Sequence, residues 1–318
     1  MKRTQAPFTR MRWALVFLAI VAASPAVMRS ESLQLRAFRV GKGPEALAFD
    51  GANIWIANQF DNSITKLGVD EGRVLQTVPV GRRPVAIAFD GANLWVANLF
   101  SNTVTIVRPD AGTAIATVAV GRGPGGLAFD GANMWVANRE SNTVTKLQAS
   151  DGTVLGTFPV GVRPMGLAAR DGSVWIANQN SGTVSRLRVS DGAPLGTFRV
   201  GKGPFGVALD GGSVWVTNFF GRSVTRLRAS DGAVQGTFPV GDGPSGIVFA
   251  GANLWVANNG SSTVTVLRQT DGAALATIPV GRGPFGIAAS LTLLSGVGIW
   301  VVDFGNDSVA LIDPRQIL

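Results

Sequence analysis

Basic side chains recur in loops that are spaced forty residues apart, one or two residues after a glycine. They are Lys42, Arg82, Arg83, Arg122, Arg163, Lys202 and Arg282, and Asp242 interrupts the series. Phenylalanines recur beside them at Phe60, Phe100, Phe205, Phe219, Phe220, Phe285 and Phe304. Cationic groups that alternate with aromatic rings suit an anionic ligand, a peptide, or single-stranded nucleic acid whose bases stack on the rings.

The residue types that the chain lacks exclude several kinds of chemistry. The sequence contains no histidine, cysteine or tyrosine. Histidine acid or base catalysis, thiol nucleophiles and imidazole metal sites are therefore excluded. Asp303 and Asp307 could bridge a cation through oxygen ligands, but no loop has the spacing of a calcium site. The sequence thus predicts no cofactor, metal or catalytic residue and favours a protein that is not an enzyme.

A forty-residue repeat must position these side chains. Residues 81–120 show it as GRRPVAIAFDGANLWVANLFSNTVTIVRPDAGTAIATVAV. The pattern begins again at Gly41, Gly121, Gly161, Gly201, Gly241 and Gly281. Apolar residues alternate with a period of two, which indicates strands, and in the first unit we expect them at 46–50, 53–58, 63–67 and 74–80. One such unit cannot bury both faces of its sheet, so the repeats predict an all-β, seven-bladed propeller with four-stranded antiparallel blades.

A tryptophan recurs in the second strand of every unit. These residues are Trp55, Trp95, Trp135, Trp175, Trp215, Trp255 and Trp300. We expect them in the core, because buried aromatic residues dominate core energetics. Leu47 and Phe49 should project from one face of the first strand, and Ala46 and Ala48 from the other. The large side of one blade would then meet the small side of the next.

The N-terminal residues 1–26 differ in kind from the repeats. Basic residues precede an apolar run from Trp13 to Ala23 and the small residues Ser24 to Ala26, which is the pattern of a secretory signal. That run is too short to span a bilayer. We therefore predict a periplasmic or secreted protein without a stable membrane span, with residues 27–318 forming the propeller. Loss of the four basic residues in the signal would lower the formal charge from +8 to +4.

The two ends of the chain complement each other. Residues 33–40 resemble a fourth strand that has no first three, whereas the seventh unit supplies only strands at 285–290, 298–303 and 307–312. We therefore predict that the N-terminal strand completes the last blade and leaves no open edge. The seventh unit also has about five extra residues, within 291–298, between its first and second strands.

Alternating strand direction divides the connections into two rims. We call the rim with the first-to-second and third-to-fourth strand turns the hairpin rim. The rim with the blade-to-blade loops and the second-to-third strand turns is the loop rim. The predicted ligand-binding residues share the loop rim and are Lys42, Arg82, Arg83, Arg122, Arg163, Lys202, Phe205, Phe219, Phe220, Arg282 and Phe285. The alternative is that they are solvated loop residues and rings that cover turn backbones.

The second strand carries a resemblance to a known family. It reads Trp95-Val96-Ala97-Asn98 in most blades and Trp215-Val216-Thr217-Asn218 in the fifth. This resembles the Tyr-Val-Thr-Asn motif of the YVTN family of bacterial β-propellers, to which YncE-like exported proteins belong. The Gly-x-x-Pro and Trp pattern also resembles, more distantly, the virginiamycin B lyase family of seven-bladed propellers. That family relies on a histidine and a bound magnesium, so its chemistry does not carry over to a chain without histidine.

Three functions follow from these observations. The favoured one is an exported binding or scaffold propeller, monomeric, whose loop rim takes a protein, a peptide or an anionic ligand. The second is binding of single-stranded nucleic acid by the basic and aromatic rim. The third is a lyase activity, which the absence of histidine disfavours.

Overall fold

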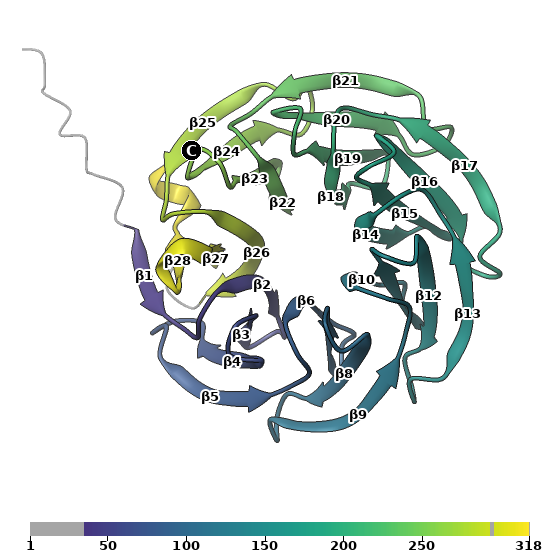
Figure 1. The fold of residues 1–318 in the computed structure, drawn as a ribbon. Coiled ribbons are helices and arrows are strands. Elements are labelled where there is room, and N and C mark those ends of the chain that lie inside the picture. Colours follow the sequence, from purple (N-terminus) through teal and green to yellow (C-terminus); the bar gives the residue numbers. More distant parts are fainter. Residues whose placement is uncertain (1–34, 293–295, 318) are drawn as a thin grey trace, which may run out of the picture. The chain divides into compact units, whose positions relative to one another are not determined.

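The computed structural model describes residues 35–292 and 296–317 (Figure 1). Seven four-stranded antiparallel sheets follow one another around a ring, and the first strand of each repeat lies innermost. This arrangement confirms the predicted seven-bladed propeller. Two short 3-10 helices, η1 (Phe304–Asn306) and η2 (Pro314–Gln316), complete the described elements. Among the described residues, no helix has the length and apolar character needed to cross a bilayer.

The strands of blades 1 to 4 have the following bounds. Blade 1 comprises β2 (Pro44–Phe49), β3 (Asn53–Asn58), β4 (Ser63–Gly68) and β5 (Val74–Pro79). Blade 2 comprises β6 (Pro84–Phe89), β7 (Leu94–Asn98), β8 (Thr103–Arg108) and β9 (Thr113–Ala119). Blade 3 comprises β10 (Pro124–Phe129), β11 (Asn133–Asn138), β12 (Thr143–Gln148) and β13 (Val154–Pro159). Blade 4 comprises β14 (Pro164–Arg170), β15 (Ser173–Asn178), β16 (Thr183–Arg188) and β17 (Pro194–Arg199).

Blades 5 to 7 follow the same order. Blade 5 comprises β18 (Pro204–Leu209), β19 (Ser213–Asn218), β20 (Ser223–Arg228) and β21 (Val234–Pro239). Blade 6 comprises β22 (Pro244–Ala250), β23 (Asn253–Asn258), β24 (Thr263–Arg268) and β25 (Ala274–Pro279). Blade 7 comprises β26 (Pro284–Thr292), β27 (Gly296–Asp303), β28 (Ser308–Ile312) and β1 (Arg36–Arg39).

The N-terminal strand closes the ring as predicted. β1 pairs antiparallel with β28, with Arg36 opposite Leu311 and Arg39 opposite Ser308. The Val40 N–H then donates to the Asp307 carbonyl at 3.0 Å. The extra residues of blade 7 extend its first hairpin, where β26 and β27 stay paired out to Thr292 and Gly296. The predicted signal segment, residues 1–26, lies outside the described residues.

The blades pack large side against small side, as the sequence predicts. Ala46 and Ala48 share a core cluster with Trp55 of their own blade and with apolar residues of blade 2. Leu47, on the opposite face of β2, packs in a cluster with Trp300 of blade 7. The second-strand tryptophans are all buried, with at most 2% of their surface exposed. Each blade boundary is therefore a separate core, and these cores hold the rims in place.

The first strand of blade 1 ends one residue earlier than predicted, because Asp50 belongs to the turn. Its Oδ1 accepts hydrogen bonds from the N–H groups of Ala52 and Asn53 at 2.8 and 2.6 Å. Its Oδ2 accepts one from the indole N–H of Trp55 at 2.7 Å. The same indole bond recurs at 2.6–3.0 Å in three more blades, to Asp90, Asp130 and Asp210. One carboxylate thus organises the turn and satisfies a buried donor.

Blade 6 lacks this carboxylate, because Ala250 occupies the position. The indole Nε1 of Trp255 is buried and has no hydrogen-bond partner among the described residues. We expect Ala250→Asp to supply the acceptor and to raise the free energy of unfolding by about 1 kcal/mol, since the turn sequence that follows is Gly-Ala-Asn, as in blade 1. The midpoint of guanidinium unfolding measures this gain. Asp130→Ala, the reverse change in blade 3, should lower that midpoint, and the prediction is wrong if neither variant shifts it.

Candidate binding site at the ring mouth

Two sets of residues lie on the loop rim, where the innermost strands begin and in the neighbouring second-to-third strand turns, and we call this region the ring mouth. The first set follows the proline that begins each innermost strand and consists of Glu45, Val85, Gly125, Met165, Phe205, Ser245 and Phe285. The second set begins each second-to-third strand turn and consists of Gln59, Leu99, Arg139, Gln179, Phe219, Asn259 and Phe304. Because the blades repeat the same backbone, differences between these residues give the ring mouth its chemistry.

A buried ion pair crosses the ring mouth from blade 1 to blade 3. Glu45 Oε1 lies 3.9 Å from Arg139 Nη2, and their side chains are only 9% and 13% exposed. Arg139 Nη2 also donates to the Gly125 carbonyl at 3.1 Å, but its Nε has no partner among the described residues. A separation of 3.9 Å is long for a hydrogen bond. The pair therefore leaves hydrogen-bonding capacity on the guanidinium unused.

Burial sets the electrostatics of this pair. Burial raises the pKa of the Glu45 carboxyl, and the positive charges of Arg139 and Arg83 oppose that rise. Burial also lowers the pKa of Arg139; Glu45 opposes this shift, while Arg163 and Arg83 lower the pKa further. Three arginines and one carboxylate thus act on one another at the ring mouth. The net charge of these four side chains is therefore positive.

Arg83 and Arg163 have an unusual backbone conformation for arginine. Their φ angles are 56° and 57°, a left-handed conformation that the other five blade-to-blade loops give to glycine. Such a conformation costs a non-glycine residue of the order of 1 kcal/mol. Arg83 is held in place by a 2.7 Å hydrogen bond from its Nε to Gln59 Oε1 and lies over the Phe100 ring at 4.7 Å. Strain of this kind often accompanies function.

A pocket opens beside Arg139 between blades 3 and 4. Its volume is about 260 Å³, and its lining residues are Leu99, Arg139, Glu140, Asn142, Val162, Arg163 and Asn180. Glu140 contributes the one acidic side chain of the lining, and it pairs with Arg122 outside at 3.4 Å. The pocket therefore presents two guanidinium groups to a ligand.

Aromatic rings occupy the part of the ring mouth that belongs to blades 5 and 7. Phe205 lies 5.8 Å from Phe219 and 5.3 Å from Phe285, measured between ring centroids. Phe219 meets Phe220 edge-on at 5.2 Å, and Phe220 is 64% exposed. The structure thus brings together the four phenylalanines predicted from the sequence. The ring mouth has a cationic part and an aromatic part.

The remaining predicted residues lie apart from this cluster. The exposed residues among them are Lys42, Arg82, Arg122, Lys202 and Arg282, and Arg122 pairs with Glu140. Their loops are fixed through the backbone instead; the N–H of Arg82, for example, donates to Ser101 Oγ at 2.8 Å. The carboxylate of Asp307 is likewise engaged, since it accepts the Gly43 N–H at 2.8 Å. Sequence analysis missed Arg139, whose one signal is a charged residue directly after the asparagine that ends the second strand.

Comparisons with known proteins confirm the fold and go no further. The chain is similar to the streptogramin B lyase structure, with a TM-score of 0.75 and 16% sequence identity. The match covers 88% of this chain and 97% of that one. For hydrazine synthase from Kuenenia stuttgartiensis the TM-score is 0.75 and the sequence identity is 19%, over 87% of this chain and 97% of that one. For the RRP9 WD40 repeats the TM-score is 0.76 and the sequence identity is 17%, over 88% of this chain and 97% of that one. At such identities the likeness shows only a shared propeller fold.

Neither protein-family models nor curated protein sequences match the chain.

Proposed function

We propose that this chain is an exported, non-enzymatic binding propeller of the YVTN type, which holds a short peptide with adjacent acidic and aromatic side chains at its ring mouth. The observation that carries the proposal is Arg139, a guanidinium in the wall of a pocket shared with Arg163 whose own carboxylate partner, Glu45, lies 3.9 Å away. Arg139 Nη2 donates to the Gly125 carbonyl at 3.1 Å, whereas the Glu45 carboxylate stays 3.9 Å away, so a ligand carboxylate would bring a closer acceptor to the terminal guanidinium nitrogens. The membership rests on the Trp-Val-Ala-Asn and Trp-Val-Thr-Asn strands, and export rests on the composition of residues 1–26.

Each part of the ring mouth has a role in this proposal. Arg139 and Arg163 would donate to the ligand carboxylate, because guanidinium groups match carboxylate geometry. The rings of Phe205, Phe219 and Phe285 would contact the aromatic side chain of the ligand, since paired rings contribute energy beyond burial alone. Glu45 would compete with the incoming carboxylate for Arg139 and so reject weakly bound anions.

Calorimetric titration with blocked dipeptides tests this function. We expect acetyl-Phe-Asp-amide to bind at least about tenfold more tightly than acetyl-Phe-Asn-amide, because a charged hydrogen bond contributes about 1.5–3 kcal/mol. Arg139→Gln should remove that difference; glutamine is the residue that blades 1 and 4 carry there, as Gln59 and Gln179. Arg188→Gln is the matched control, because Arg188 is an exposed arginine that pairs with Asp191 on the hairpin rim. This variant should keep the difference in affinity between the two peptides. Equal binding of both peptides would refute the proposal.

Single-stranded nucleic acid is the competing ligand, and it has one specific observation in its favour. Phe60, Phe100 and Phe220 are 60%, 52% and 64% exposed on the loop rim and could stack with bases. Binding of a labelled oligonucleotide that weakens steeply with salt, together with no peptide binding, would favour this function instead.

A lyase reaction is not proposed, although one structural neighbour is a streptogramin B lyase. The chain has no histidine to act as acid or base. Within residues 35–292 and 296–317, no group of three or more acidic side chains is placed to hold a metal ion. The side chains present therefore do not fit that family's histidine and magnesium chemistry.

A further inference from the structure

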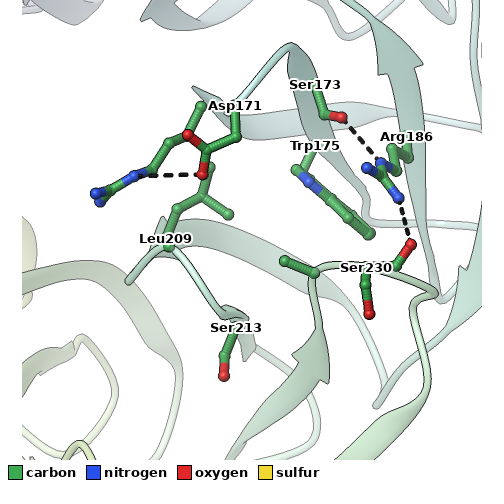
Figure 2. A pocket seen from close by; sticks show the side chains of 10 residues that line it. Asp171, Ser173, Trp175, Arg186, Leu209, Ser213 and Ser230 are labelled. Carbon is green, nitrogen blue, oxygen red and sulfur yellow. Dashed lines mark hydrogen bonds and ion pairs between the residues drawn. The ribbon is translucent and has the colours of Figure 1, made fainter.

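The hairpin rim has a second pocket, which lies between blades 4 and 5 (Figure 2). Its volume is about 220 Å³, and Arg170, Trp175 and Arg186 of blade 4 line it together with Leu209 and Ser213 of blade 5. It opens on the opposite rim from the ring mouth, because antiparallel strands carry the two sets of connections to opposite ends. This pocket is therefore separate from the site proposed above.

Trp175 breaks the pattern by which the other blades satisfy the indole N–H. An aspartate accepts that hydrogen bond in blades 1, 2, 3 and 5, and Ser290 accepts it in blade 7 at 2.9 Å. Arg170 stands at the corresponding position in blade 4, so this blade has no aspartate carboxylate to accept a hydrogen bond from Trp175 Nε1. Trp175 is also the one second-strand tryptophan with accessible surface, 2% against 0% for the other six. Trp175 is also one of the residues that line this open pocket.

Blade 6 shows that losing the aspartate does not by itself create such a pocket. Trp255 lacks an acceptor, but its Nε1 is fully buried, so nothing can reach it. In blade 4 the long side chain of Arg170 extends toward blade 5, where Nη2 lies 3.5 Å from the position that a Cβ on Gly211 would take. Arg170 and Gly211 thus line the pocket from its two sides.

The charges of this pocket favour an anion. Arg186 lies over the Trp175 ring at 5.0 Å, and it donates from Nε to Ser173 Oγ and from Nη1 to the Ser230 carbonyl, both at 3.0 Å. Arg170 Nε lies 3.7 Å from Asp171 Oδ2, and both of these side chains are largely exposed. Two guanidinium groups against one carboxylate leave a positive surplus. Figure 2 shows Arg186 beside the indole of Trp175, with its hydrogen bonds to Ser173 and Ser230.

We propose that this pocket binds the carboxylate of a small organic acid, which takes the place that the aspartate carboxylate holds in blades 1, 2, 3 and 5. One carboxylate oxygen accepts the Trp175 indole N–H, Arg170 balances the charge, and Leu209 contacts the carbon chain. Blade 5 shows that such a carboxylate is stabilised in its charged form. Burial alone would raise the pKa of Asp210, but hydrogen bonds from Trp215 and from the N–H groups of Ser213 and Gly212 outweigh it and lower the pKa.

Nuclear magnetic resonance of the indole N–H groups tests the proposal directly. Acetate is the probe, because it is the aspartate side chain without its backbone. In ¹⁵N-labelled protein titrated with sodium acetate at constant ionic strength, we expect one indole cross-peak to shift and to saturate in the millimolar range. Trp175→Phe identifies that peak by removing it. The Trp255 indole, unpaired but inaccessible, is the internal control and should not move.

A double variant tests whether acetate replaces the missing side chain. Arg170→Asp with Asp171→Gly gives blade 4 the turn Asp-Gly-Gly-Ser, which blade 5 has at residues 210–213. In the absence of acetate, the Trp175 indole peak of the double variant should lie near the position that the parent peak reaches at saturating acetate. Added acetate should no longer shift it. The proposal is refuted if no indole peak shifts in the parent, if sodium chloride produces the same shift, or if the double variant still responds.

Discussion

A chain that begins at Gly41 should unfold at a much lower denaturant concentration than one that begins at residue 27, with a loss of at least about 4 kcal/mol. Residues 27–40 include β1, which pairs with β28 from the opposite end of the chain. Without β1, the outer N–H and C=O groups of β28 lose their partners and Trp300 loses the ring of Phe38, which lies 5.7 Å away. β1 also ties blade 7 to blade 1, because Arg36 Nη1 donates to the Asp70 carbonyl at 3.1 Å.

A point variant separates the contribution of the Phe38 ring from the other effects of truncation. Phe38→Ala keeps the backbone pairing of β1 and removes the ring that packs on Trp300 and against Gly72 of blade 1. We expect about half of the loss, because Phe38 is only partly buried. Phe158→Ala, the corresponding ring on Trp135 in blade 3, is the matched control inside a continuous blade. Equilibrium unfolding followed by tryptophan fluorescence measures the parent chain and all three variants. An unchanged midpoint and cooperativity in the truncated chain would show that the ring does not depend on this strand.

The truncated chain should also associate with itself. Its β28 would become an open sheet edge with unpaired backbone groups, which readily pair with another chain. Analytical ultracentrifugation at several protein concentrations should show this association, whereas the chain that begins at residue 27 should not change its sedimentation.

The sequence predicted the fold well because the repeat encodes it locally. Apolar alternation placed the strands, and the missing fourth strand of the last unit predicted the pairing of β1 with β28. Each of these features depends on residues within one repeat or on a count of strands. No knowledge of the distance between blades was needed.

The binding residues could be predicted only in part, because their relations cross the ring. Phe205 and Phe285 are recognisable by position, but the contact of Glu45 with Arg139 joins blades 1 and 3 and depends on the diameter of the closed ring. Asp50 was predicted to end the first strand, whereas it lies in the turn, and its bond to the Trp55 indole was missed, because that bond joins two elements of the blade. Trp175 became notable only once that bond was visible in its neighbours.

The asparagine that ends the second strand explains why blade 7 should respond to pH. In six blades this residue is a buried asparagine whose Nδ2 donates to the third strand; Asn258, for example, donates to Thr265 Oγ1 at 2.8 Å. Blade 7 has Asp303 there, with Ala310 in place of the threonine. Asp303 is 2% exposed, and its Oδ1 has no partner among the described residues. Burial raises its pKa from 3.8 to about 7, although a hydrogen bond from the Gly281 backbone partly opposes the rise.

Asp303→Asn should therefore stabilise the protein at high pH and change its stability little at low pH. Between about pH 4 and pH 7 the folded state keeps a proton on Asp303 that the unfolded state has released, so stability falls as the pH rises through this window and levels off above pH 7. A shift of roughly three units corresponds to at most about 4 kcal/mol; since solvent and relaxation reduce it, we expect a gain of about 1–2 kcal/mol at pH 8. Urea unfolding of parent and variant at pH 5 and pH 8 measures the difference. Asn258→Asp in blade 6 is the reciprocal control and should introduce a new loss of stability above pH 7. A difference between parent and Asp303→Asn that does not vary with pH would show that Asp303 stays charged in the folded protein.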